Sequence, residues 1–132
     1  MKALSEIQLP DDRRYTDEHV WIKPDGEEFA VGISDFAQDQ LGEVVFVDLP
    51  SAGVRFGAGD GFGTVESIKS VNTLYMPVAG EITAVNEALD ATPALVNVAC
   101  YDKAWMLRVK PDAVADVEAL LTADAYRDVL EK

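Results

Sequence analysis

The sequence contains a single cysteine, Cys100, and a single histidine, His19. One thiol excludes a disulfide within the chain, and one cysteine with one histidine is too few for the usual zinc sites, which combine several such ligands. No metal site is therefore expected. The default role of Cys100 is packing as a small apolar side chain.

Long apolar runs are also missing. No stretch approaches the roughly 18 apolar residues that a membrane-spanning helix requires. The opening residues, "MKALSEIQLPDDRRY", hold no continuous apolar segment of the kind that a secretion signal needs. We therefore expect a soluble, cytoplasmic protein with no membrane partner.

Positive charge is scarce as well, because 11 basic residues face 24 acidic ones and the formal net charge is −13. Nucleic acids and anionic lipids are bound through clusters of cations, so the charge argues against both as partners. The acidic residues are spread along the chain, as on an ordinary solvated surface. The charge favours macromolecular partners that offer basic surfaces.

The chain has enough apolar material for a core, since 48 % of its 132 residues are hydrophobic. We expect one domain over residues 1–132. Residues 19–33 predict a hairpin around "KPDGEE", because an Asp-Gly pair favours a tight turn. Ser34 predicts a helix start before "DFAQDQL", and Gly42 predicts its end.

Short β-type segments follow this helix. "EVVFVDLP" predicts a strand at 43–50, and alternating apolar residues predict further strands at 61–68, 70–76 and 78–85. Beyond Pro111 the apolar spacing becomes helical, so helices are expected over about 112–131. "GAGDGFG" has the wrong glycine spacing for a phosphate-binding loop and is interpreted as a β-turn. The pattern predicts a mainly β sandwich with a helical C-terminus.

Lys69 stands out because it is the only lysine between Lys23 and Lys103. It falls between two predicted strands, so it should occupy the tip of a hairpin. A lysine in that position holds its amine in water, where a modifying enzyme can reach it. The alternative is an ordinary solvated turn residue.

The residues around Lys69 carry a resemblance. "YTDEHVW", "VGISDFAQDQLGEVVFVDLP", "GFGTVESIKSV", "LYMPVAGEITAVNEAL", "LVN" and "AYRDVL" resemble, in order and spacing, the glycine cleavage system H protein family. The resemblance implies a barrel-sandwich hybrid fold of the lipoyl-domain type, with a lipoyl hairpin at about 61–85. It also implies a lipoyl group on Lys69, joined by an amide. A biotin-accepting lysine usually lies between two methionines, whereas Lys69 lies between Ile68 and Ser70.

The family's role is that of a carrier and not an enzyme, with no catalytic residues of its own. The resemblance implies that the arm takes an aminomethyl group from glycine decarboxylase, passes it to the aminomethyltransferase and is reoxidised by dihydrolipoyl dehydrogenase. A lipoate ligase or lipoyltransferase would attach the cofactor, with Glu66 and Ser67 helping it to recognise the turn. His19, Val20, Thr73 and Cys100 are expected to shape the surroundings of the parked arm.

The sequence departs from the family at several of these positions. The family usually has "EHEW" where this chain has "EHVW", so Val20 replaces an acid. Thr73 replaces the Asp of "SDLYSPVSG", and Cys100 replaces the Pro of "NEDPYGEGW". Removing carboxylates makes a groove less suited to a cationic amine. Two alternatives follow: an H-like lipoate-binding protein that carries sulfur for heterodisulfide-reductase-like sulfur-oxidising proteins, and an unmodified binding module that has lost the arm.

Overall fold

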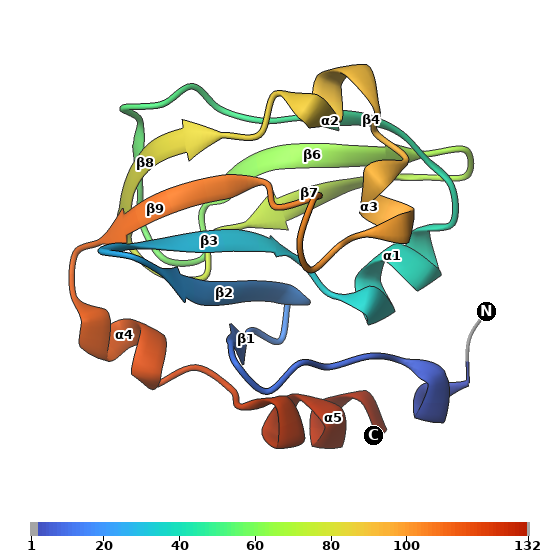
Figure 1. The fold of residues 1–132 in the computed structure, drawn as a ribbon, viewed down its shortest axis with the longest axis horizontal. Coiled ribbons are helices and arrows are strands. Elements are labelled where there is room, and N and C mark those ends of the chain that lie inside the picture. Colours follow the sequence, from blue (N-terminus) through green and yellow to red (C-terminus); the bar gives the residue numbers. More distant parts are fainter. Residues whose placement is uncertain (1–2, 132) are drawn as a thin grey trace.

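The computed structural model describes residues 3–131. Within them, nine strands form two antiparallel sheets, one of six strands in the order β1-β2-β3-β9-β8-β5 and one of three in the order β4-β6-β7 (Figure 1). The strands are β1 (Arg14–Tyr15), β2 (Val20–Asp25), β3 (Glu28–Ile33), β4 (Val44–Asp48), β5 (Arg55–Phe56), β6 (Gly61–Ser67), β7 (Val71–Tyr75), β8 (Gly80–Val85) and β9 (Leu107–Pro111). The helices are the 3₁₀ helix η1 (Leu4–Glu6), α1 (Asp35–Leu41), α2 (Ala88–Ala91), α3 (Leu95–Val98), α4 (Val114–Glu118) and α5 (Ala123–Glu131).

The N-terminal hairpin and the helix after it are confirmed. Gly26 turns the chain between β2 and β3 with a φ of 69°. The Ser34 hydroxyl accepts a hydrogen bond from the Ala37 N–H at 3.2 Å, which caps the start of α1. Gly42 ends α1 with a φ of 77°, a backbone conformation that glycine adopts without steric cost. These local signals place α1 directly before β4.

Strands β6 and β7 form the hairpin that carries Lys69. The following strand, β8, leaves this hairpin and pairs with β9 and β5 in the other sheet. The segment 61–85 is therefore divided between the two sheets, and the hairpin itself spans 61–75. Residues from both sheets, including Val65 and Leu74 from one and Val31 and Ile82 from the other, pack in one core.

The C-terminal helices are confirmed and have a small core of their own. The Tyr126 ring on α5 stacks on the Tyr15 ring of β1 with centroids 4.8 Å apart. Both rings belong to a second buried cluster with Trp21 and Ala123. The Thr122 hydroxyl accepts from the Ala125 N–H at 3.2 Å and so begins α5. This packing holds α5 along the β1 side of the large sheet (Figure 1).

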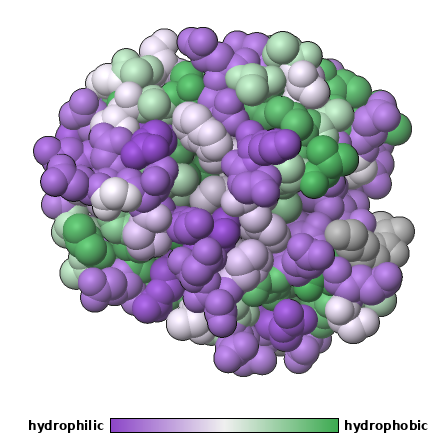
Figure 2. Space-filling view, viewed as in Figure 1, coloured by the Kyte–Doolittle hydropathy of each residue, from purple (hydrophilic) through white to green (hydrophobic). Residues whose placement is uncertain are grey.

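The "GAGDGFG" segment is a turn, as predicted. The Asp60 N–H donates to the Gly57 carbonyl oxygen at 3.1 Å, and the Asp60 carboxylate accepts from the Gly57 N–H at 2.7 Å. The face of the molecule in Figure 2 is mainly hydrophilic and carries separate hydrophobic patches. Between residues 3 and 131, no helix has the length and apolar character needed to cross a membrane.

Candidate functional site

The turn between β6 and β7 presents Lys69 to solvent. The Ser67 hydroxyl accepts hydrogen bonds from the backbone N–H groups of Lys69 at 3.3 Å and of Ser70 at 3.2 Å. The Ser67 N–H donates to the Ser70 carbonyl oxygen at 2.8 Å. Because Ser67 is only 5 % exposed, its hydroxyl holds the turn from inside. The exposed Lys69 side chain therefore extends from a turn that hydrogen bonds hold in place.

A second contact fixes the turn to the rest of the molecule. The Ile68 N–H donates to the Glu43 carbonyl oxygen at 3.1 Å, which joins the turn to the corner between α1 and β4. The Lys69 side chain lies over this corner, since a Cβ added to Gly42 would be 3.3 Å from Lys69 Cε. The absence of a side chain at Gly42 therefore leaves room for the lysine stem.

Asn97 on α3 holds the same corner. Its side-chain amide donates to the Gly42 carbonyl oxygen at 2.8 Å and to Gln38 Oε1 at 3.1 Å, and its Oδ1 accepts from the Val44 N–H at 2.9 Å. Our sequence interpretation did not assign this role, although Asn97 is the last residue of the "LVN" motif. Its hydrogen-bond partners lie more than fifty residues earlier in the chain, so no local sequence pattern predicts these bonds.

A groove of about 440 Å³ begins beside Lys69 and has β7 and α1 among its walls. Ser70, the next residue after Lys69, is part of its lining. Further lining residues are Asn72, Thr73 and Tyr75 from β7, Phe36, Ala37 and Gln40 from α1, and Glu18 and His19 from the segment before β2. The wall from α1 was not predicted, although Phe36 and Gln40 have the i, i+4 spacing of residues on one helix face.

His19 is held in the groove by α5. Its Nδ1 lies 2.7 Å from the Tyr126 hydroxyl, which in turn lies 2.8 Å from the Ser34 hydroxyl. The His19 backbone has a φ of 68°, and its ring packs against Phe36 with centroids 4.9 Å apart. Burial lowers the pKa of His19 below its ordinary value, although the nearby carboxylates of Glu18 and Asp17 act in the opposite direction. The imidazole is therefore neutral at neutral pH.

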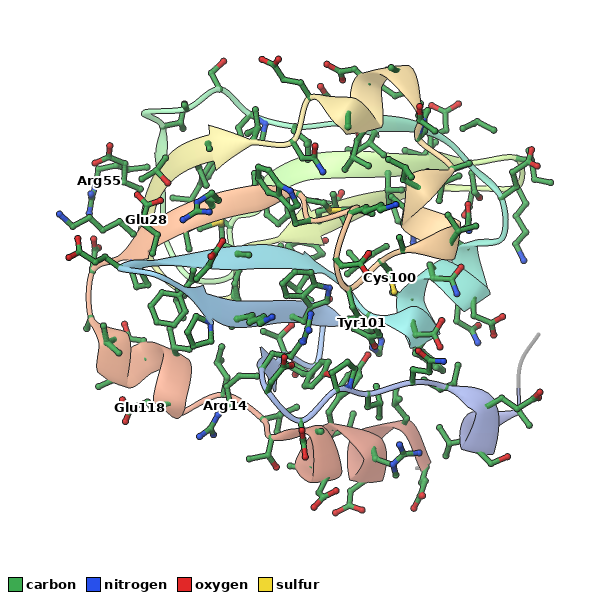
Figure 3. All side chains as sticks on the ribbon, in the orientation of Figure 1. Arg14, Glu28, Arg55, Cys100, Tyr101 and Glu118 are labelled. Carbon is green, nitrogen blue, oxygen red and sulfur yellow. The ribbon has the colours of Figure 1, made fainter. Side chains whose placement is uncertain are left out.

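The structure places Val20 and Cys100 outside this groove. Val20 is 1 % exposed and belongs to the main core. The Cys100 carbonyl accepts from Trp21 Nε1 at 3.0 Å, and Cys100 borders a different pocket together with Asp35 and Tyr101. Figure 3 labels Cys100 and the adjacent Tyr101. The expectation that Val20 and Cys100 shape the surroundings of the arm stays a prediction, and neither residue is in the lining of this groove. His19 and Thr73 do line the groove.

Glu66 lies on the exposed side of β6, opposite Phe46 of β4 and Val71 of β7 in the strand register. It is not a groove residue. Val71 and Ile68, which is 71 % exposed, are also exposed beside the Lys69 turn. Among residues 3–131, no group of three or more His, Cys, Asp or Glu side chains is arranged to hold a metal ion.

Comparison with known proteins shows the family of this chain. The family model described as glycine cleavage H-protein matches residues 13–132. The chain belongs to the glycine cleavage H-protein family. It is 47 % identical over 125 residues to a glycine cleavage system H protein of Listeria monocytogenes serotype 4b, covering 95 % of this chain and 100 % of the relative. The corresponding figures for the protein of Bacillus subtilis are 44 % over 126 residues, with 96 % and 99 % covered.

A solved structure supports the same conclusion. The crystal structure of a glycine cleavage system H protein from Mycobacterium marinum superimposes with a TM-score of 0.86 at 39 % sequence identity. The match covers 94 % of this chain and 100 % of the other. It confirms the predicted barrel-sandwich fold of the lipoyl-domain type.

Proposed function

We propose that this member of the H-protein family is the lipoyl-carrying shuttle of a glycine cleavage system, with lipoate joined by an amide to Lys69. The observation that carries the proposal is the position of Lys69. It lies exposed at the tip of a turn that Ser67 and Glu43 hold rigid, and the groove begins at the next residue. A swinging arm requires this combination of a rigid base and a mobile side chain.

The groove fits such an arm in length and character. The five residues of β7, from Val71 to Tyr75, span about 17 Å, and an extended lipoyl-lysine reaches about 14 Å from its Cα. The apolar side chains of Phe36, Ala37 and Leu41 line the groove beside polar ones. Each methylene that docks on them contributes about 0.8 kcal/mol, so a parked arm gains roughly 2 to 3 kcal/mol before its loss of conformational entropy. Parking of this strength is reversible.

The chain contributes position and surroundings, while the bound lipoyl group supplies the dithiol chemistry. Ser67 and the Ile68 N–H keep the attachment point fixed relative to the groove. His19 and Thr73 line the groove, and Phe36 packs against the His19 ring. Forming the amide removes the charge of the lysine, which makes the arm easier to bury. The protein acts as a carrier in this account, and its partners perform the catalysis.

The partners proposed are glycine decarboxylase, the aminomethyltransferase and dihydrolipoyl dehydrogenase, preceded by a lipoate ligase or lipoyltransferase that modifies Lys69 in the cytoplasm. The sulfur-carrier alternative finds no support among the relatives, which are named glycine cleavage system H proteins. Glu66 is exposed beside the turn, which suits contact with the modifying enzyme. Ser67 acts from within by shaping the turn.

The direct test of the attachment is lipoylation in vitro. The purified protein is incubated with lipoate, ATP and a lipoate ligase, and the modified residue is located by peptide mass spectrometry. We expect modification of Lys69 alone, no modification of Lys69→Arg, and unchanged modification of the control Lys103→Arg. Modification of another lysine, or of none with an active ligase, would contradict the proposal.

A further inference from the structure

Three polar side chains from different parts of the fold meet behind the wall of the groove. They are those of His19, which precedes β2, of Ser34, which caps α1, and of Tyr126, which lies on α5. The Tyr126 hydroxyl lies 2.7 Å from His19 Nδ1 and 2.8 Å from the Ser34 hydroxyl. Ser34 and Tyr126 are both 0 % exposed. Their hydroxyl protons must therefore be accepted within the protein, because bulk water does not reach them.

The hydrogen-bond partners of Ser34 fix the direction in which these groups donate. The Ser34 hydroxyl oxygen accepts from the Ala37 N–H, and the Tyr126 hydroxyl is its other partner among residues 3–131. The Ser34 proton therefore goes to the Tyr126 oxygen. The Tyr126 proton then goes to His19 Nδ1, the remaining partner of that hydroxyl. A neutral imidazole that accepts at Nδ1 carries its own proton at Nε2.

The opposite direction of donation is unfavourable. If His19 Nδ1 carried the ring proton and donated it to Tyr126, one of the two buried hydroxyl protons would have no acceptor in the described part of the chain. A buried donor without a partner loses its hydration and gains no hydrogen bond in return. Burial also lowers the pKa of His19, so the ring holds one proton at neutral pH and not two. The form with the proton at Nε2 is therefore favoured.

The His19 ring is also held in place, with Nε2 left open. The His19 carbonyl oxygen accepts from the Ser34 N–H at 2.9 Å, and the ring packs against Phe36. The Tyr126 ring stacks on the Tyr15 ring with the two planes 1° apart, which keeps the Tyr126 hydroxyl beside Nδ1. Nε2 has no hydrogen-bond partner within the described residues, and His19 lines the groove. The Nε2–H group is therefore available to a molecule in the groove.

We propose that Tyr126 is a positioning residue that, together with Ser34, fixes His19 as a hydrogen-bond donor at Nε2. The inference rests on the proposed function, in which the lipoyl arm lies in this groove. The arm carries acceptors that an N–H group can bind, namely its amide carbonyl oxygen and its sulfur atoms. Because Nδ1 already accepts the Tyr126 proton, His19 presents a donor to the arm and no basic nitrogen. A hydroxyl on the C-terminal helix thereby sets the polarity of the groove wall.

Nitrogen-15 NMR of the imidazole ring tests this proposal in the unmodified protein. His19 is the only histidine of the chain, so its ring signals are assigned without ambiguity. The spectra compare the wild type, Tyr126→Phe and the control Tyr101→Phe at about pH 8, above the ordinary pKa of histidine. Tyr126→Phe removes the hydroxyl and keeps the stacked ring. The control removes another tyrosine hydroxyl, one that bonds to Gln8 and Asp35 and not to His19.

We expect the proton at Nε2 in the wild type and in Tyr101→Phe, in roughly tenfold or greater excess over the form protonated at Nδ1, because the latter leaves a buried hydroxyl unpaired. In Tyr126→Phe, Nδ1 loses its donor, so the two forms should be present in comparable amounts. The wild-type spectrum alone tests the position of the proton, whatever the stability of the variants.

A second spectrum is recorded after enzymatic lipoylation. The Nε2–H signal should shift in the wild type, because the arm supplies an acceptor. It should not shift in Lys69→Arg treated with the same ligase, which receives no arm. In lipoylated Tyr126→Phe the shift should be smaller, because only part of the molecules carry the proton at Nε2.

A proton on Nδ1 in the wild type, or an unchanged ratio of the two forms in Tyr126→Phe, would overturn the inference and leave the proposed function standing. An unshifted Nε2–H signal in wild-type protein confirmed by mass to be lipoylated would overturn it as well. Failure of an active ligase to modify Lys69 would instead overturn the proposed function. The two failures are distinguishable, since the first spectrum requires no lipoyl group.

Discussion

A single hydroxyl, that of Ser67, shapes the turn that presents Lys69. It accepts from the N–H groups of Lys69 and Ser70 while being almost completely buried. A modifying enzyme must receive the lysine in one defined position, because a misplaced reacting group loses the advantage of proximity and orientation. Under the proposed function, Ser67 therefore affects the rate at which Lys69 is modified.

Replacing Ser67 by Ala should lower the rate of lipoylation several-fold and cost about 1 kcal/mol of unfolding free energy, since two backbone donors lose their acceptor. The rate is measured with a lipoate ligase under single-turnover conditions, and the stability by urea unfolding. Ser51→Ala removes an exposed hydroxyl in the loop before β5 and serves as the control. A rate equal to that of the control would show that the turn does not need Ser67.

His19 gives the molecule a dependence on pH. Its pKa in the folded chain is lowered from the ordinary value of 6.5, so between these two values the unfolded chain binds a proton that the folded chain lacks. The resulting contribution to stability is present above about pH 6.5 and is lost as the pH falls toward the folded pKa.

The wild type should therefore lose more unfolding free energy than His19→Asn between about pH 7.5 and 5.5. Asparagine tolerates the positive φ at this position and does not titrate. The measurement is urea unfolding of both proteins across this pH interval. Because both proteins have the same carboxylates, titration of these groups contributes equally to the two losses. Equal losses in the two proteins would contradict a lowered pKa for His19.

At the scale of the elements, the corner between α1 and β4 connects the site to the fold. α1 supplies one wall of the groove, and the carbonyl of Glu43 in the corner holds the Ile68 N–H of the lysine turn. Asn97 of α3 bonds to Gly42 and Val44 on both sides of this carbonyl. Through these hydrogen bonds, Asn97 on the short helix α3 supports the turn that carries Lys69.

We predict that Asn97→Ala destabilises the protein by about 2 to 3 kcal/mol, roughly one for each hydrogen bond lost. It should also slow lipoylation, because the support of the turn loosens. Val98→Ala changes the next residue of the same helix, which is 80 % exposed, and should leave both quantities unchanged. The midpoint of urea unfolding and the rate of lipoylation are measured for both variants. If Asn97→Ala changes these two quantities no more than Val98→Ala does, Asn97 does not support the turn.

The elements with strong local signals were predictable from the sequence. Ser34 and Gly42 delimit α1, and the Asp25-Gly26 turn joins β2 to β3, as predicted. The helices α2 and α3 were not predicted, because each has four residues and lacks a side-chain cap. The departure of β8 into the other sheet depends on long-range pairing that local alternation does not encode.

Only the part of the candidate site that has a local sequence signal was predictable. The exposed position of Lys69 follows from local alternation and from the two strands around it. The groove could not be predicted from local alternation, because its walls come from the segment before β2, from α1 and from β7. Position 20 drew attention as a departure from the family, yet the side chain at the groove wall is that of Glu18, two residues earlier. Only the fold shows which of the two lines the groove.

For the whole molecule, the net charge of −13 governs association more than folding. Its partners should bind through basic surfaces, so binding of the lipoylated protein should weaken on the order of tenfold as salt rises from about 0.1 M to 1 M, over which the Debye length falls from about 10 Å to 3 Å. Titration calorimetry with the aminomethyltransferase would measure this. Affinity that is independent of salt would contradict charge-assisted docking.

The central claim is that this protein carries an aminomethyl group on Lys69, and glycine–carbon dioxide exchange tests it most directly. The enzymatically lipoylated protein is added to glycine decarboxylase with labelled carbon dioxide, and Lys69→Arg treated in the same way is the blank. The account predicts exchange well above the blank. Exchange at the level of the blank, from a protein confirmed by mass to be lipoylated, would contradict it.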